Sequence, residues 1–97
     1  MNYSEAVEAL VNKQVNMEFY ASYVYLAMAS FFGRDDQALR GFAKFFRKSA
    51  DEEREHALKL AHYQALRGGR VVFQVIFVEI LIGALRRIFS YVELLFF

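Results

Sequence analysis

Hydrophobic and polar residues follow a helical period in two long runs, residues 4–32 and residues 37–67. In both runs apolar side chains recur every three or four residues, the spacing that gathers them on one face of an α-helix. We predict that the first run turns inward Val7, Leu10, Val11, Gln14, Glu18, Ala21, Tyr25, Met28 and Phe32. We predict that the second turns inward Leu39, Phe42, Phe46, Ser49, Glu53, His56, Leu60 and Tyr63.

Helix-ending residues separate and flank the two runs. Asn2 or Ser4 can cap the start of the first helix, and Gly68-Gly69 ends the second. Between them lies Gly33-Arg34-Asp35-Asp36, in which the glycine can take the left-handed conformation and the aspartates can cap the next helix. So short a connection makes the helices antiparallel. The pattern therefore predicts an all-α fold, a long helical hairpin that belongs to a bundle.

The chain becomes much more hydrophobic after Arg70. Residues 1–70 hold 19 of its 23 charged residues, whereas 20 of the 27 residues of 71–97 are hydrophobic. Residues 71–78 are rich in β-branched side chains and residues 79–97 have helical spacing, so we favour a helical C-terminal segment. Its uncharged stretches are shorter than the roughly 18 residues that a transmembrane helix needs. A surface-lying amphipathic helix and a segment packed on the hairpin are both open.

The composition narrows the possible functions. Of 97 residues, 57% are hydrophobic and 18% aromatic, more than one small domain hides, which predicts burial against another chain or a membrane. The net charge of +1 does not suggest nucleic-acid binding. Without cysteine, a metal would need carboxylate or imidazole ligands. The N-terminus, MNYSEAVEAL, does not resemble a signal peptide, so we expect a cytoplasmic protein.

Three polar residues interrupt the apolar faces. Glu18 lies between Val11 and Tyr25 at heptad spacing, and Glu53 breaks the second face in the same way. His56 follows Glu53 by three residues, so their side chains are neighbours on the helix. A buried carboxylate is costly unless it is neutralised, and a cation is the simplest neutraliser of two. This ligand set suits iron, manganese or zinc.

Ordinary interpretations compete with a metal site. Glu52, Arg54 and Glu55 fit a solvated charged turn, and Tyr25 fits a core position. His62 falls off the apolar face and is expected to be exposed. Agreement between two helices favours a metal, because Glu18 and Glu53 break their faces independently. The spacing alone leaves both interpretations open.

Several segments resemble eukaryotic ferritins of the type with ferroxidase activity. They are Asn12–Leu26, Arg34–Asp36, Glu52–Ala57, Tyr63–Gln64 and Arg67–Val71, within a gapless similarity over residues 2–74. The resemblance implies a four-helix bundle with a di-iron centre that oxidises ferrous iron with oxygen. It also implies subunits that assemble into a hollow cage storing ferric mineral.

The resemblance also implies roles for individual residues. Glu18 and His56 would be ligands of the first iron, and Glu53 the carboxylate that bridges to the second. Tyr25 would lie beside the centre, as a hydrogen-bond or electron donor. Glu52 and Glu55 resemble acidic residues of mineral nucleation, although Leu58 replaces a third acid of that cluster.

The similarity to ferritins is not recognisable after Gln74. Ferritins continue into a second helix pair that supplies another Glu and a Gln to the iron centre, whereas residues 75–97 do not resemble it. We therefore divide the chain into a ferritin-like hairpin, residues 1–74, and a non-family tail, residues 75–97. The tail has the character of read-through sequence, a truncated gene or a divergent isoform.

We expect iron binding and storage with Fe(II) oxidation by oxygen, weakened by the missing ligands. We expect a homo-oligomer, a two-fold dimer of hairpins, or co-assembly with full-length ferritin subunits. The alternative is a non-enzymatic isoform that associates with such subunits, or with membranes, through its apolar tail.

Overall fold

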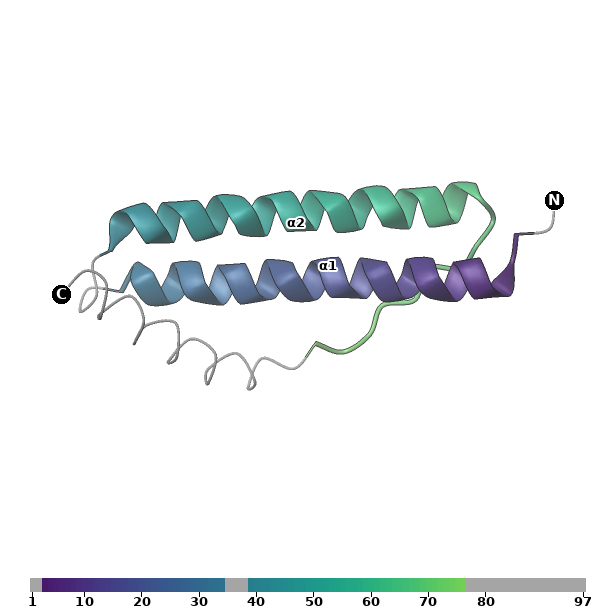
Figure 1. Ribbon diagram of the computed structural model, residues 1–97, viewed down its shortest axis with the longest axis horizontal. Helices are drawn as coiled ribbons and strands as arrows, with labels where there is room; N and C mark the ends of the chain where they lie inside the picture. The colour runs from purple at the N-terminus through teal and green to yellow at the C-terminus, as the bar shows by residue number, and fades with distance from the viewer. Residues whose placement is uncertain (1–2, 35–38, 77–97) are drawn as a thin grey trace.

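The computed structural model describes residues 3–34 and 39–76 and consists of two long antiparallel helices (Figure 1). Helix α1 spans Glu5–Phe32 and helix α2 spans Arg40–Leu66. The described residues contain no strand. The predicted all-α hairpin is therefore confirmed. Neither helix in the described ranges has a stretch both long and apolar enough to cross a membrane.

The helix ends follow local capping chemistry, with two differences from expectation. Ser4 caps α1 as predicted, with its hydroxyl accepting from the Val7 N–H at 3.5 Å. Gly33 is right-handed, with φ −85°, because its N–H continues the helical pattern by donating to Ala29. The second helix begins at Arg40 rather than near residue 37, since Leu39 has the non-helical N-cap backbone. The predicted aspartate caps lie outside the described residues.

Glycine ends α2 as the sequence predicts. Gly68 has φ +80°, a left-handed conformation that glycine adopts without steric cost. The Gly69 N–H donates to the Gln64 carbonyl at 2.9 Å and the Gly68 N–H donates to Ala65 at 3.1 Å. This is the Schellman arrangement, which satisfies the last carbonyls of a helix and turns the chain out of it.

Alanine and serine make up most of the buried contact between the two helices. We call this contact the seam; its buried members are Val15, Ser22, Ala29, Ala50, Ala57 and Gln64. They recur every seven residues on each helix, and the alanines and serine allow the backbones to approach closely. The Ser22 hydroxyl donates to the Ala50 carbonyl across the seam at 2.8 Å. The seam residues are therefore neighbours of the predicted inward residues, and the true contact is rotated slightly around the axis of each helix.

Gln64 places a polar side chain in the seam with its hydrogen bonds satisfied. Its amide N–H donates to the Glu8 carbonyl at 2.9 Å, and its amide oxygen accepts from the Tyr3 hydroxyl at 2.6 Å. The residue is fully buried. These bonds tie the start of α1 to the end of α2.

An aromatic cluster closes the hairpin at its other end. Phe32 is fully buried, stacks on Phe46 at 5.6 Å between ring centroids and also contacts Phe42. Tyr25 stacks on the same Phe46 ring at 6.1 Å. Met28 is buried within this cluster. The apolar part of the predicted inward faces is therefore buried here.

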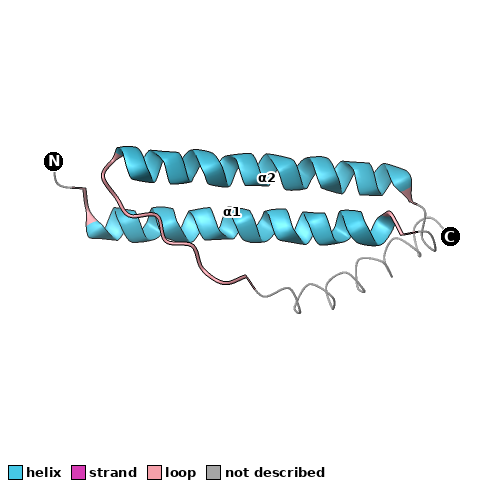
Figure 2. Cartoon of the chain, turned by 180° about the vertical axis from the view of Figure 1, so that it is seen from behind, coloured by secondary structure: helices cyan, strands magenta, loops and turns pink. Residues whose placement is uncertain are grey.

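After α2, residues 70–76 run in irregular backbone along α1 (Figure 2). Asn12 donates to the Arg70 carbonyl and accepts from the Val72 N–H, and Asn16 does the same for Val72 and Gln74. Asn12 and Asn16 are four helical residues apart, a rise of about 6 Å, and the residues that they bond are two extended residues apart, a rise of about 6.6 Å. The spacing of the asparagines therefore matches that of the segment. Residues 70–76 are therefore neither helix nor strand, and the part of the tail whose spacing predicts a helix, residues 79–97, lies outside the described residues.

Candidate metal centre

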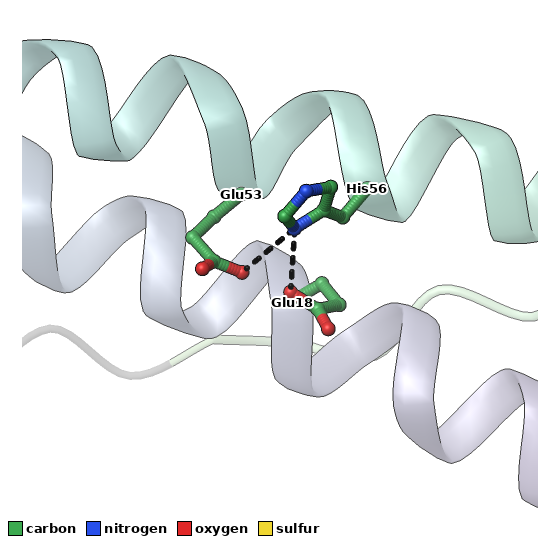
Figure 3. A group of neighbouring side chains, drawn as sticks. All are labelled: Glu18, Glu53 and His56. Atoms are coloured by element: carbon green, nitrogen blue, oxygen red, sulfur yellow. Dashed lines mark ion pairs between the residues drawn. The ribbon is translucent and has the colours of Figure 1, made fainter.

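Three side chains predicted from the sequence meet between the helices. Glu18 comes from α1, and Glu53 and His56 come from adjacent turns of α2 (Figure 3). The His56 Nδ1 lies 3.6 Å from Glu53 Oε2 and 3.8 Å from Glu18 Oε2. One ligand atom of each residue lies within 4.8 Å of the others. The expected convergence near the middle of the hairpin is confirmed.

The group lies beside the seam rather than in it. The side chains of Glu18 and Glu53 are 18% and 26% exposed, and that of His56 is 55% exposed. We call this side of the hairpin the site face; it carries Val7, Val11, Glu18, Tyr25, Phe46, Glu53, His56 and Leu60. The segment 70–76 covers the opposite side of α1, through Asn12 and Asn16. The prediction that His56 points to a buried face is therefore wrong for the described part of the chain.

The two carboxyl groups shift each other's pKa in opposite directions. The pKa of Glu18 is lowered, chiefly because its carboxylate accepts a hydrogen bond from Glu53. The pKa of Glu53 is raised, first by that same hydrogen bond and then by burial and the Glu18 charge. Two carboxylates this close cannot both ionise without repulsion unless positive charge lies between them.

Gln14 orients Glu18, a role that we did not predict. Its amide N–H donates to Glu18 Oε1 at 3.0 Å, and this bond also contributes to the lowered pKa of Glu18. The sequence places the two residues four positions apart, which is the spacing at which helical side chains meet. That spacing could have predicted the hydrogen bond between Gln14 and Glu18. The bond leaves Glu18 Oε2 facing His56.

The other candidate residues are not in the cluster. Tyr25 is half-buried against Phe46, and its seven-residue separation from Glu18 corresponds to about 10 Å along the helix. Glu52 and Glu55 are exposed. His62 is exposed as predicted.

The donor set can hold a divalent cation. Two carboxylates balance its charge, and an imidazole adds a borderline ligand, a combination suited to iron, manganese or zinc. In the ranges 3–34 and 39–76 it is the one group of three such residues close enough to share an ion. A cation at this point would neutralise both carboxylates and remove the repulsion between them.

Known proteins share this sequence pattern. A family profile described as the ferritin-like domain matches residues 8–92. The ferritin-1 heavy chain of Schistosoma mansoni is 63% identical over 73 residues, 75% of this chain and 42% of the relative. The ferritin heavy chain of Echinococcus granulosus is 59% identical over 73 residues, with the same coverage. A chloroplastic ferritin of Malus baccata var. xiaojinensis is 55% identical over 75 residues, 77% of this chain and 30% of the relative.

The matches cover only part of each relative. The chain spans less than half the length of these relatives. The family profile extends beyond Gln74, whereas the alignments to these relatives cover 73 to 75 residues. The boundary at residue 74 stays a prediction. Since the profile covers well over half of the sequence, this chain belongs to the ferritin family.

Proposed function

We propose that this chain binds Fe(II) as its substrate at Glu18, Glu53 and His56 and oxidises it to Fe(III), in support of iron storage. One observation carries the proposal: two carboxylates and an imidazole from different helices converge within 4.8 Å. Such a group is costly to bring together unless a cation is bound. The names of the matched relatives, which are ferritins, agree with iron as that cation.

Each ligand has a distinct part in this proposal. Glu18, oriented by Gln14, supplies one oxygen and His56 supplies Nδ1. The His56 Nδ1 faces both carboxylates, and Glu53 would bridge to a second iron through its other oxygen. Carboxylates bind both oxidation states of iron, because hard oxygen ligands accept the increase in charge.

The reaction requires an electron acceptor, which we take to be dioxygen. Two Fe(II) ions each give one electron, and dioxygen takes up two protons to become hydrogen peroxide. Glu18, Glu53 and His56 suffice for one iron only. A single hairpin is therefore expected to oxidise Fe(II) far more slowly than a complete ferritin subunit.

Tyr25, Glu52 and Glu55 have secondary roles in the proposal. Tyr25 would donate a hydrogen bond or an electron from the next part of the site face. Glu52 and Glu55 are exposed on α2 and would attract ferric ions after oxidation. Co-assembly with longer ferritin subunits and a cytoplasmic location stay predictions, and among the matched relatives some are named chloroplastic.

Aerobic oxidation of Fe(II) by the purified chain tests the proposal. Glu53→Ala and His56→Ala are each expected to lower the initial rate at least about tenfold, because each removes a ligand in contact with the ion. Asp51→Asn and His62→Ala are the matched controls, since both residues are exposed on α2 outside the cluster. A slow rate that none of the four substitutions changes would show that these ligands do not form a working site.

A further inference from the structure

The cluster lies at the midpoint of both helices, which makes the hairpin suited to pairing with itself. Glu18 is the fourteenth of the 28 residues of α1, and Glu53 is the fourteenth of the 27 residues of α2. A two-fold axis across the site face at this height would overlay the full lengths of both helices. It would also bring the two clusters opposite each other. A cluster nearer one end of the hairpin could not give full overlap of the helices and opposed clusters at the same time.

Two copies would supply the ligand pattern of a complete di-metal bundle. Carboxylate-bridged di-iron bundles use one Glu from each of two helices and a Glu-x-x-His pair from each of the other two. One hairpin contributes Glu18 and the pair Glu53 and His56, half of that set. A second copy related by the two-fold axis contributes the other half.

Charge makes the pairing depend on metal. Without cations, the pairing would bring four carboxylates together at the centre of a bundle, which is unfavourable because of repulsion and desolvation. Two divalent cations neutralise four carboxylates. Each cation would also gain oxygen ligands that one hairpin lacks. Metal would therefore be both the neutraliser and the link between two copies.

The site face has apolar surface on both sides of the cluster. Toward the aromatic end it carries Tyr25 and Phe46, both half-buried in the hairpin. Toward the other end it carries Val11 and Leu60, also half-buried, and Val7, which is 40% exposed. A helix pair laid across this face would bury these side chains.

We propose that two copies of this chain pair through their site faces, driven by divalent metal, into a four-helix bundle with two ions at its centre. This inference rests on the proposed metal site and adds the partner that completes it. The partner is a second copy of the same chain.

Sedimentation velocity of the purified 97-residue chain, with and without Zn(II), tests the pairing. Zinc does not change oxidation state, so binding and assembly are measured apart from oxidation. We expect a monomer without metal and a dimer at one zinc per chain, with the metal content measured by mass spectrometry. Val7→Lys is expected to weaken the dimer about tenfold or more without changing a ligand. Leu26→Lys, 47% exposed on the other side of the seam, is the matched control.

The outcomes separate the dimer from the metal site. A chain that binds one zinc through Glu53 but stays monomeric would overturn the dimer and leave the site intact; the same result would follow if the chain's own tail covered the site face. Absence of Glu53-dependent zinc binding would count against the proposed function itself. A dimer that forms equally without metal, or that Glu53→Gln does not affect, would overturn the metal link.

Discussion

The seam and the site face lie side by side on the same two helices, yet they are built from opposite kinds of residue. Four of the six seam residues are alanine or serine, and the polar members of the seam, Ser22 and Gln64, have hydrogen-bond partners. The site face combines the large aromatic residues Tyr25 and Phe46 with two close carboxyl groups whose pKa values are shifted in opposite directions. The seam thus specifies the hairpin, while the site face holds unfavourable charge where a ligand can use it.

The largest effect is expected at Phe32, which is fully buried and stacks on Phe46 of the site face. Phe32→Ala is expected to lower the free energy of unfolding by about 3–5 kcal/mol, because it leaves a cavity among Phe42, Phe46 and Met28. Urea denaturation followed by circular dichroism measures the loss. Phe45→Ala is the control: that side chain is 60% exposed, and a cost of about 0.5 kcal/mol or less is expected. Equal losses would mean that the aromatic cluster does not close the hairpin.

The seam can be broken by adding volume rather than removing it. Ala57→Leu is expected to cost about 1–3 kcal/mol, because Ala57 is fully buried between the helices and a larger side chain would force them apart. The measurement is the shift in thermal midpoint. Ala65→Leu makes the same chemical change at an exposed position of α2 and should be nearly neutral. If both variants melt together, the close contact assigned to Ala57 is wrong.

Much of this architecture could be predicted from the sequence, since large apolar residues at helical spacing reveal helices whatever their partner. The spacing of Glu18 and Glu53 also predicted that they would meet. The seam was missed because alanine and serine do not stand out in a count of hydrophobic residues, although Ala50 and Ala57 recur every seven. Gly68 was predictable as a left-handed C-cap, whereas Gly33 was not, because its conformation depends on how the connection continues.

The exposure of His56 could not be predicted for a related reason. Sequence periodicity shows which residues share a face but not which of two neighbouring faces meets the partner helix. A small rotation of α2 about its axis is enough to move the His56 side chain from a buried to an exposed position. The i,i+4 bond from Gln14 to Glu18 depends only on one helix and was within reach of the sequence.

The smallest expected effect is a pH dependence confined to the site face. The folded-state pKa of Glu18 is lowered, so its contribution to stability is lost as pH falls below the ordinary value of 4.5. The folded-state pKa of Glu53 is raised, so the folded chain holds its proton more tightly than the unfolded chain does, and stability falls as pH rises from 4.5 through the raised value. The contribution of the pair is therefore greatest near 4.5. Partial exposure of both groups keeps the effect small.

Glu53→Gln isolates the rising-pH side of this dependence, because the amide still donates to Glu18 but has no proton to lose. In metal-free buffer the thermal midpoint of the variant, relative to the unchanged chain, should rise between pH 4.5 and pH 7. Added Zn(II) should reverse the order at pH 7, since a cation stabilises only the chain that keeps both carboxylates. A difference that stays flat with pH would mean that the pKa of Glu53 is not raised in the folded chain. A flat difference that nevertheless reverses with zinc would leave the metal site intact and place its carboxylates farther apart before the ion binds.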